Sequence, residues 1–195
     1  KRQGCAVVAD LLAIEAVTIE RLAQLCELID ADYAIIEAPV PDDAVAAPEG
    51  AYVDETQAHR VLQTGVPHIA VHCDVDEEGE TLSAFATWEG TLPASEEEEV
   101  AAAVAEINWA SVAPTLSYLA GDSSADADGS RTTAASEIQL CANRAMAVGE
   151  GLSLAQLGHF LLSSLASFAE VFDVVAQRFP QAVTWNDDGD SEGES

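Results

Sequence analysis

Residues 153–179 read SLAQLGHFLLSSLASFAEVFDVVAQRF and predict one long helix, which stops where Phe179-Pro180 follows. Ser153 and Gln156 form a capping box at its start. Farther along, apolar residues recur at alternating steps of four and three, which is the spacing of one continuous apolar seam. The seam consists of Leu161, Leu165, Phe168, Phe172, Val175 and Phe179. We expect this seam to pack on a sheet of the same chain.

The same helix carries apolar residues away from the seam, namely Leu154, Leu157, Phe160, Leu162 and Val171. A helix that is apolar on two sides needs two coverings, so we expect the sheet on one side and a second copy or a client protein on the other. The expected dimer and partner contacts are Leu157, Phe160, Leu161, Phe168, Val171 and Phe172. Leu157, Phe160 and Val171 should then stay exposed in a monomer. The homodimer should tighten as salt screens the repulsion between acidic subunits.

Alternating residues upstream of this helix predict the sheet. Val66–Val75 and Thr81–Glu89 each alternate between apolar and polar, and a Gly-containing turn joins them into an antiparallel hairpin. Further strands are expected at Tyr33–Glu37, Thr115–Ala120 and Thr132–Met146. Tyr52–Gln63 fits a strand or a helix equally well. Trp88, at the end of the hairpin, and Trp109 are weaker partner candidates, because we expect both in the core.

Two more helices follow from capping residues and apolar spacing. Thr18 is the expected N-cap of the first, with Glu20 in its first turn. Its apolar stripe is Ile19, Leu22, Leu25, Cys26 and Ile29. Ser95 and Glu98 form the expected capping box of the second. Its buried stripe is Val100, Ala103, Val104 and Ile107.

The resulting order is α-β-β-β-α-β-β-α, which predicts an α+β fold with an antiparallel sheet packed against helices. A length of 195 residues suits one domain. We expect an N-terminal extension at 1–17, a single domain at 18–185 and an acidic disordered tail at 186–195. Residues 38–51 and 121–130 are expected loops, since they are rich in Pro, Gly, Ser and acids.

The charge balance argues against several partners. The chain has 35 acidic residues against 7 basic ones, a net charge of −28. Nucleic acid is a poor partner, because its binding depends on Lys and Arg neutralising phosphates. The acidity fits a solubilising surface, a salt-adapted cytoplasm or a basic protein partner, and composition does not separate these. A membrane span is not expected, since no run of about 18 uncharged apolar residues occurs. Cys5–Val17 lacks the features of a secretion signal, so a cytoplasmic location is expected.

No residue pattern indicates a catalytic, cofactor or metal site. Cys5, Cys26, Cys73 and Cys141 are widely spaced and predict buried free thiols in a reducing compartment. Asp126–Gly129 resembles a fragment of a calcium loop whose other ligand positions are missing. His68 and His72 are expected on one strand face with Asp74, but about 13 Å apart, too far for one metal. Glycine-rich phosphate loops are absent. We therefore expect no catalytic residue, no cofactor and no metal.

Three segments of the second half resemble the YbjN family of bacterial proteins, named as sensory transduction regulators. Glu106-Ile107-Asn108-Trp109 closes the middle helix, Gly151-Leu152-Ser153-x-x-Gln156-Leu157 opens the last one, and Phe179-Pro180 ends it. The resemblance covers roughly residues 18–180. It implies a curved antiparallel sheet with helices on one face, similar to type III secretion chaperones, commonly dimeric and without established catalytic residues.

The sequence therefore indicates a non-enzymatic protein-binding module, a sensory transduction regulator or chaperone-like adaptor that acts as a homodimer. An enzyme with a carboxylate-rich site is the alternative from another class, and a concave pocket of converging carboxylates would favour it. An inert acidic structural domain is the third reading, and it predicts a monomer without a large exposed apolar patch.

Overall fold

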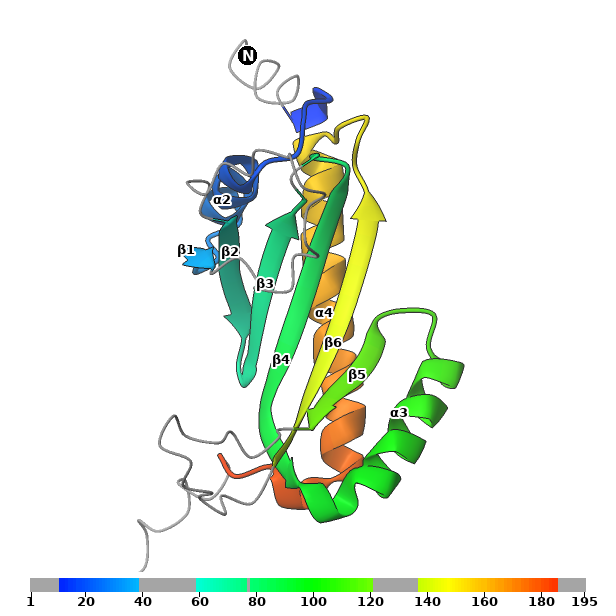
Figure 1. The fold of residues 1–195 in the computed structure, drawn as a ribbon. Coiled ribbons are helices and arrows are strands. Elements are labelled where there is room, and N and C mark those ends of the chain that lie inside the picture. The colour runs from blue at the N-terminus through cyan, green and yellow to red at the C-terminus, as the bar shows by residue number, and fades with distance from the viewer. Residues whose placement is uncertain (1–10, 39–58, 77, 121–136, 186–195) are drawn as a thin grey trace, which may run out of the picture. The chain divides into compact units, whose positions relative to one another are not determined.

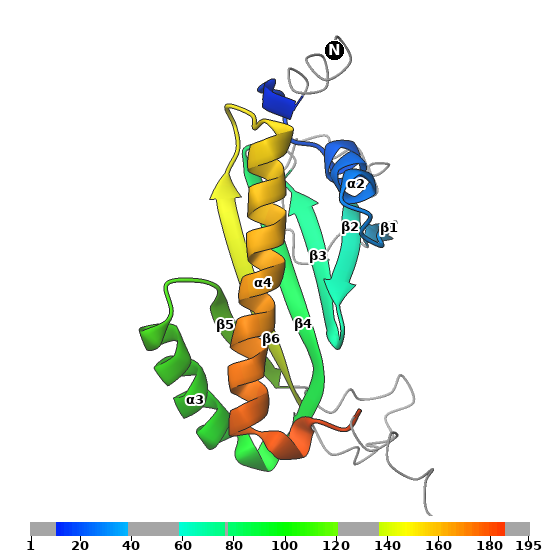
Figure 2. The ribbon, with the colours of Figure 1, turned by 180° about the vertical axis from the view of Figure 1, so that it is seen from behind.

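The computed structural model describes residues 11–38, 59–76, 78–120 and 137–185, which form an α+β fold (Figures 1 and 2). Six antiparallel strands form one sheet in the order β1-β2-β3-β4-β6-β5. The strands are β1 Ala34–Ala38, β2 His59–Val66, β3 Ile69–Val75, β4 Thr81–Pro93, β5 Thr115–Ala120 and β6 Glu137–Ala147. The helices are α2 Ile19–Leu28, α3 Glu97–Ala110 and α4 Leu154–Arg178, with short 3-10 turns at Ala94–Glu96 and Pro180–Ala182. The predicted fold class is confirmed.

The expected element order misses one strand, β2. The stretch Tyr52–Gln63 fitted either a strand or a helix, and from His59 onward it is a strand. The expected strand Val66–Val75 is divided, because Pro67 and His68 form a tight turn between β2 and β3. His68 has a φ of 64°, and proline followed by a residue of positive φ is the signature of a type II turn. The local alternation pattern continues through this turn and hides it.

The chain divides into two compact units that alternate along the sequence. Unit 1 comprises Lys1–Gly65, His72–Ala84 and Ala145–Phe160. Unit 2 comprises Val66–Val71, Phe85–Arg144 and Leu161–Ser195. Strands β3, β4 and β6 and helix α4 each contribute residues to both units. The expected loops at 38–51 and 121–130 and the tail at 186–195 lie outside the described residues, except for Ala38, which ends β1.

In unit 1, helix α2 begins and ends as its sequence predicts. The Thr18 hydroxyl accepts a hydrogen bond from the Arg21 backbone N–H at 3.3 Å. The stripe buries Ile19, Leu22, Leu25 and Cys26, while Ile29 is half-buried beyond the last turn. Asp30 follows with a φ of 55°, in the left-handed region that terminates a helix.

One arginine joins the segment before α2 to the segment before α4. The Nη1 atom of Arg21 lies 2.8 Å from the Glu15 carbonyl, 3.0 Å from that of Ala16 and 2.9 Å from that of Leu152. Glu15 and Leu152 also exchange two backbone hydrogen bonds. Gly151, at a φ of +79°, permits this approach, since a Cβ there would lie 2.5 Å from the Glu15 oxygen. Arg21 therefore closes unit 1 across 131 residues of sequence.

We predict that Arg21→Met lowers the free energy of unfolding by about 1.5–3 kcal/mol, because hydrogen bonds from a charged donor to three carbonyls are lost. Arg60→Met is the matched control. Arg60 is exposed and pairs with exposed Glu20, and such a surface pair contributes under about 1 kcal/mol. Urea unfolding of both variants is the measurement. Equal losses would contradict the role assigned to Arg21.

In unit 2, helix α3 starts later than its sequence suggests. Ser95 lies in the 3-10 turn after β4, and the N-cap residue is Glu96, which makes no side-chain capping bond. The predicted capping box of Ser95 and Glu98 is therefore wrong, because β4 continues to Pro93 and the chain needs a turn before α3 begins. Val100 and Ala103 are buried, whereas Val104 and Ile107 are half-buried. The apolar stripe of α3 is thus only partly buried in the core.

Asn108 of α3 forms hydrogen bonds with β5, the last strand in the sheet order. Its side-chain amide donates to the Leu116 carbonyl at 2.9 Å and accepts from the Leu116 N–H at 2.8 Å. Leu116 belongs to β5, whose strand neighbour is β6. Both backbone groups of Leu116 are therefore bonded to α3, much as they would be to another strand. Covering an edge in this way limits pairing with foreign strands.

We predict that Asn108→Ala costs about 1–3 kcal/mol of stability, since two backbone groups of a buried strand residue lose their partners. Amide hydrogen exchange at Leu116 should accelerate in the same variant. Asn143→Ala serves as the control, because Asn143 is exposed on β6 and its removal should change stability by less than about 0.5 kcal/mol. An unchanged exchange rate at Leu116 would refute the pairing.

Helix α4 confirms the predicted cap and most of the predicted seam. The Ser153 N–H donates to Gln156 Oε1 at 2.9 Å, and the Gln156 N–H donates to Ser153 Oγ at 3.2 Å. Every seam residue is buried except Leu165, which is half-buried. Among the described helices, α4 is the one long and apolar enough to cross a membrane by length and composition. Core helices of soluble proteins have the same length and composition.

The described cysteines are buried and free, as predicted. Burial raises the pKa of the Cys73 thiol to about 12, with smaller contributions from nearby Cys26 and Asp74. Burial also raises the pKa of Cys26 and of Cys141. Cys5 lies outside the described residues.

We predict that Cys26, Cys73 and Cys141 do not react with a thiol reagent in the folded Cys5→Ser variant. At pH 8 a thiol of pKa 12 is ionised to roughly one part in ten thousand, and the thiolate is the reactive form. In guanidinium chloride all three should react quickly. Absorbance of the released chromophore counts them, and rapid labelling of the folded protein would contradict their burial.

Candidate functional site

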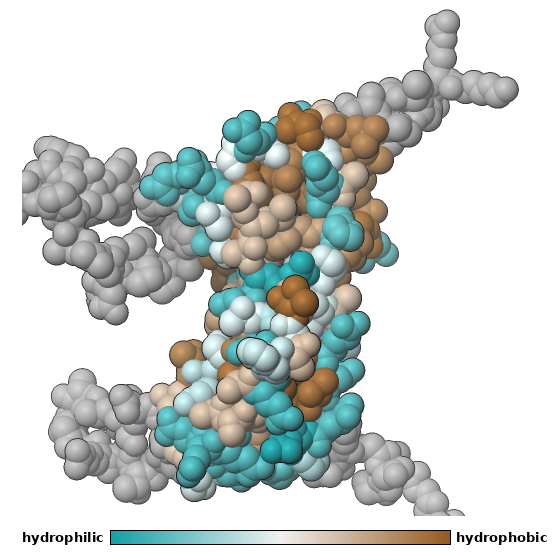
Figure 3. All heavy atoms as spheres, turned by 90° about the vertical axis from the view of Figure 1, so that its right-hand side faces the viewer, coloured by the Kyte–Doolittle hydropathy of each residue, from teal (hydrophilic) through white to brown (hydrophobic). Residues whose placement is uncertain are grey.

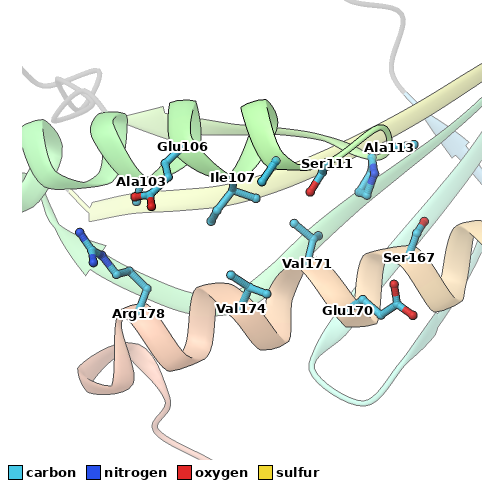
Figure 4. Close-up of a pocket in the computed structure, with 12 residues that line it drawn as sticks. Ala103, Glu106, Ile107, Ser111, Ala113, Ser167, Glu170, Val171, Val174 and Arg178 are labelled. Atoms are coloured by element: carbon cyan, nitrogen blue, oxygen red, sulfur yellow. The ribbon is translucent and has the colours of Figure 1, made fainter.

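A groove of ≈ 400 Å³ lies between α3 and α4 within unit 2. Its apolar lining comes from Ala103, Ile107 and Ala110 on α3 and from Val171 and Val174 on α4. Figure 4 shows Ile107 pointing toward α4 and both valines pointing toward α3. The α3 residues follow one another at steps of four and three, so they form one side of the helix. The apolar stripe of α3 thus continues from the core into an open groove.

Charged and polar side chains border this lining. Glu106 of α3 and Glu170 of α4 contribute carboxylates, and Arg178 contributes a guanidinium. In Figure 4, Arg178 lies at one end of the groove, while Ser167 and Glu170 lie toward the other. All three charged residues are exposed. The groove therefore combines an apolar floor with a border that is negative on balance.

The groove lies beside unusually exposed apolar residues. Val174 inside it is 48% exposed, and at the end of α3 Trp109 is 93% and Val112 is 107% exposed. On the face in Figure 3, brown apolar side chains in the lower part are separated by teal ones, so the apolar area there is divided into small patches. The expectation that Trp109 lies in the core is wrong, because α3 turns Val100 and Ala103 inward instead. Trp88 is in the core as expected, at 2% exposed.

The residues predicted to form the partner surface are buried inside the single chain. Exposed fractions are 0% for Leu157, Leu161 and Phe168, 6% for Phe160, 5% for Val171 and 2% for Phe172. The expectation that Leu157, Phe160 and Val171 stay exposed in a monomer is therefore wrong. Dimerisation itself stays a prediction, but these six residues expose little surface for it, and of the six Val171 alone lines the groove described above.

The chain buries α4 along its seam and away from it, since Leu154, Leu157, Phe160 and Val171 are buried as well. In unit 1, α2 comes close to α4 at Gly158, where a Cβ would lie 3.2 Å from a methyl group of Leu25. In unit 2, Trp88 of β4 stacks on Phe172, with ring centroids 6.1 Å apart. Of the apolar residues off the seam, Leu162 remains 51% exposed.

The histidine pair expected on one strand face does not form. His68 lies in the turn before β3, so His72 and Asp74 alone share that strand. His68 Nδ1 instead lies 2.7 Å from Glu89 Oε2. Within the described ranges no three His, Cys, Asp or Glu side chains are grouped to hold a metal ion. Asp126–Gly129 lies outside those ranges.

Comparisons with known proteins show a relation to a solved structure. No family model matches the chain, and no curated protein matches it. The chain is similar to the crystal structure of YbjN from E. coli, described as "a putative transcription regulator", with a TM-score of 0.56 and 13% identity. The match covers 86% of this chain and 97% of that one. The chain has a YbjN-like fold. At this identity the likeness concerns the fold alone.

Sequence reasoning missed the groove for a definite reason. Ile107 was assigned to the buried stripe of α3, and Val171 to the partner surface of α4. In the structure Ile107 is half-buried, Val171 is buried, and both residues line the groove. One residue could have indicated the groove: Ala110 continues the apolar spacing of Ala103 and Ile107 to the end of α3.

Proposed function

We propose that this protein is a non-enzymatic regulator or adaptor that binds a short amphipathic helix of a partner protein in the α3–α4 groove. The observation that carries the proposal is the open apolar floor formed by Ile107, Ala110 and Val174. Laying an apolar helix face into a groove between helices is a common recognition mode, read through anchors spaced three and four residues apart. The YbjN-like fold agrees with a regulatory role.

Charge supports a basic partner segment. Glu106 and Glu170 border the groove, and the whole chain carries a net charge of −28. A segment with Lys or Arg beside its apolar anchors would be attracted over a long range, and salt would weaken that attraction. An acidic segment would be repelled. We therefore assign the groove to a basic amphipathic helix.

A second copy of the chain is the competing occupant. Two copies would bring two acidic borders together, so pairing should appear as salt rises. The carboxylates at the groove could also serve an enzyme, but Glu106 and Glu170 lie beside one guanidinium and two serines without a third carboxylate in the lining. The YbjN structure is described as a regulator, which agrees with the binding role.

We predict that a synthetic helical peptide with Leu at positions spaced three and four apart and Lys elsewhere binds the protein at about 0.15 M salt. Val174→Lys should weaken this binding about tenfold, a change of about 1.4 kcal/mol, because it removes apolar floor and adds a repelling charge. Leu162→Lys is a closely matched control. Leu162 is on the same helix and 51% exposed against 48% for Val174, but it lies outside the groove lining.

Calorimetry separates the outcomes. Equal weakening by Val174→Lys and Leu162→Lys would show attraction by overall charge and refute the groove. The same peptide with Glu in place of Lys should not bind. Light scattering of the peptide-free protein across salt concentrations completes the set, and a salt-induced dimer that Val174→Lys abolishes would make the second copy the occupant.

A further inference from the structure

Four aromatic rings of unit 2 meet where the described chain ends. The Trp185 ring stacks on the His68 ring, with centroids 4.2 Å apart and planes 11° from parallel. Trp185 also meets Trp88 edge to face at 5.7 Å and 90°, and Trp88 stacks on Phe172. A cavity of ≈ 470 Å³ opens beside these rings, lined in addition by Pro67, Pro180, Asp173 and Gln177. The Trp185 ring is therefore packed against His68 and Trp88 and forms one wall of the cavity.

The inner wall of the pocket is rigidly built. Trp88 and Phe172 are each 2% exposed. The Trp88 ring lies over Gly90, two residues along β4, where an added Cβ would come within 2.5 Å of ring carbons. Glycine is needed at this position, because any larger residue would push the indole away. The sequence Trp88-Glu89-Gly90 thus holds one indole flat as a surface for another.

The outer wall of the pocket is His68, whose backbone has a positive φ that side chains rarely adopt. His68 occupies the third position of the turn at a φ of 64°, where glycine or asparagine is the ordinary choice. Its imidazole is fixed by Glu89, whose Oε2 lies 2.7 Å from Nδ1, and its ring faces Trp185. A side chain kept at a backbone cost indicates a use for that side chain.

We propose that this pocket is a binding site for a tryptophan side chain presented by an extended peptide segment, and that Trp185 is its intramolecular occupant. The chemistry of the ligand follows from the ring that packs there, an indole that stacks on His68 and meets Trp88 edge to face. Asp173 and Gln177 offer acceptors for an indole N–H. A partner segment bearing tryptophan enters by displacing Trp185. This site is separate from the α3–α4 groove and stands or falls independently of it.

The first measurement asks whether Trp185 covers Trp88. In a Trp109→Phe background, Trp185→Phe and Trp185→Ala each leave Trp88 as the single tryptophan. The phenylalanine variant keeps a ring in the pocket and the alanine variant does not. Acrylamide quenching of Trp88 fluorescence should be several-fold stronger in the alanine variant. Equal quenching would overturn the assignment of Trp185 as occupant.

The second measurement asks whether the vacated pocket takes a free indole. Saturation-transfer NMR with indole should give a signal for Trp185→Ala that is several-fold weaker for wild type, where Trp185 competes. Adding His68→Ala to Trp185→Ala should weaken indole binding about two- to tenfold, the range of one aromatic stack. Trp109→Ala is the control, since it removes an exposed indole and should create no binding.

Binding of indole to wild type and to Trp185→Ala with equal strength would refute the site. If Trp185→Ala does not fold, the wild-type protein is tested instead. Excess indole should then shift the NMR resonances of the His68 ring. Unchanged His68 resonances would equally overturn the proposal. Failure of these tests leaves peptide binding in the groove untouched, because the groove and this pocket share no lining residue.

Discussion

The burial of α4 on two sides is the constraint on which the rest of the molecule depends. Its seam and its second apolar side together require far more covering than one sheet face supplies. In unit 1 α2 approaches α4 at Gly158, in unit 2 Trp88 of β4 stacks on Phe172, and Leu157, Phe160 and Val171 away from the seam are buried too. Because most apolar residues of α4 are buried within the chain, we infer that a partner uses surface that these contacts leave open. The groove between α3 and α4 is one such surface.

Acidity and apolar surface act together in this protein. A net charge of −28 opposes association of like chains and favours solubility. We propose that apolar openings in such a molecule bind either a positively charged partner or an aromatic ring whose binding does not depend on charge. The α3–α4 groove, bordered by Glu106 and Glu170, fits the first description. The pocket of Trp185 fits the second, since stacking between flat rings depends little on net charge.

Both openings depend on hydrogen bonds that tie distant segments together. Asn108 fixes α3 on β5 through both backbone groups of Leu116, and this anchors the helix end that carries Ala110. Glu89 holds the His68 ring against Trp185. The YbjN-like fold thus supplies the sheet and the helices, and a few polar contacts help to hold the elements that border the open apolar surface. These contacts are better guides to function here than overall fold similarity at 13% identity.

The sequence by itself determined the local elements of this protein. The Thr18 cap, the capping box of Ser153 and Gln156 and the alternation in β3 and β4 depend on residues a few positions apart, whose geometry is common to all chains. Only the tertiary structure decided which apolar sides are covered. Phe160 and Trp109 look alike in sequence, yet one is buried and the other is 93% exposed, because segments far away in the chain cover the first and not the second. The pairing of His68 with Trp185 likewise joins residues that no local pattern relates.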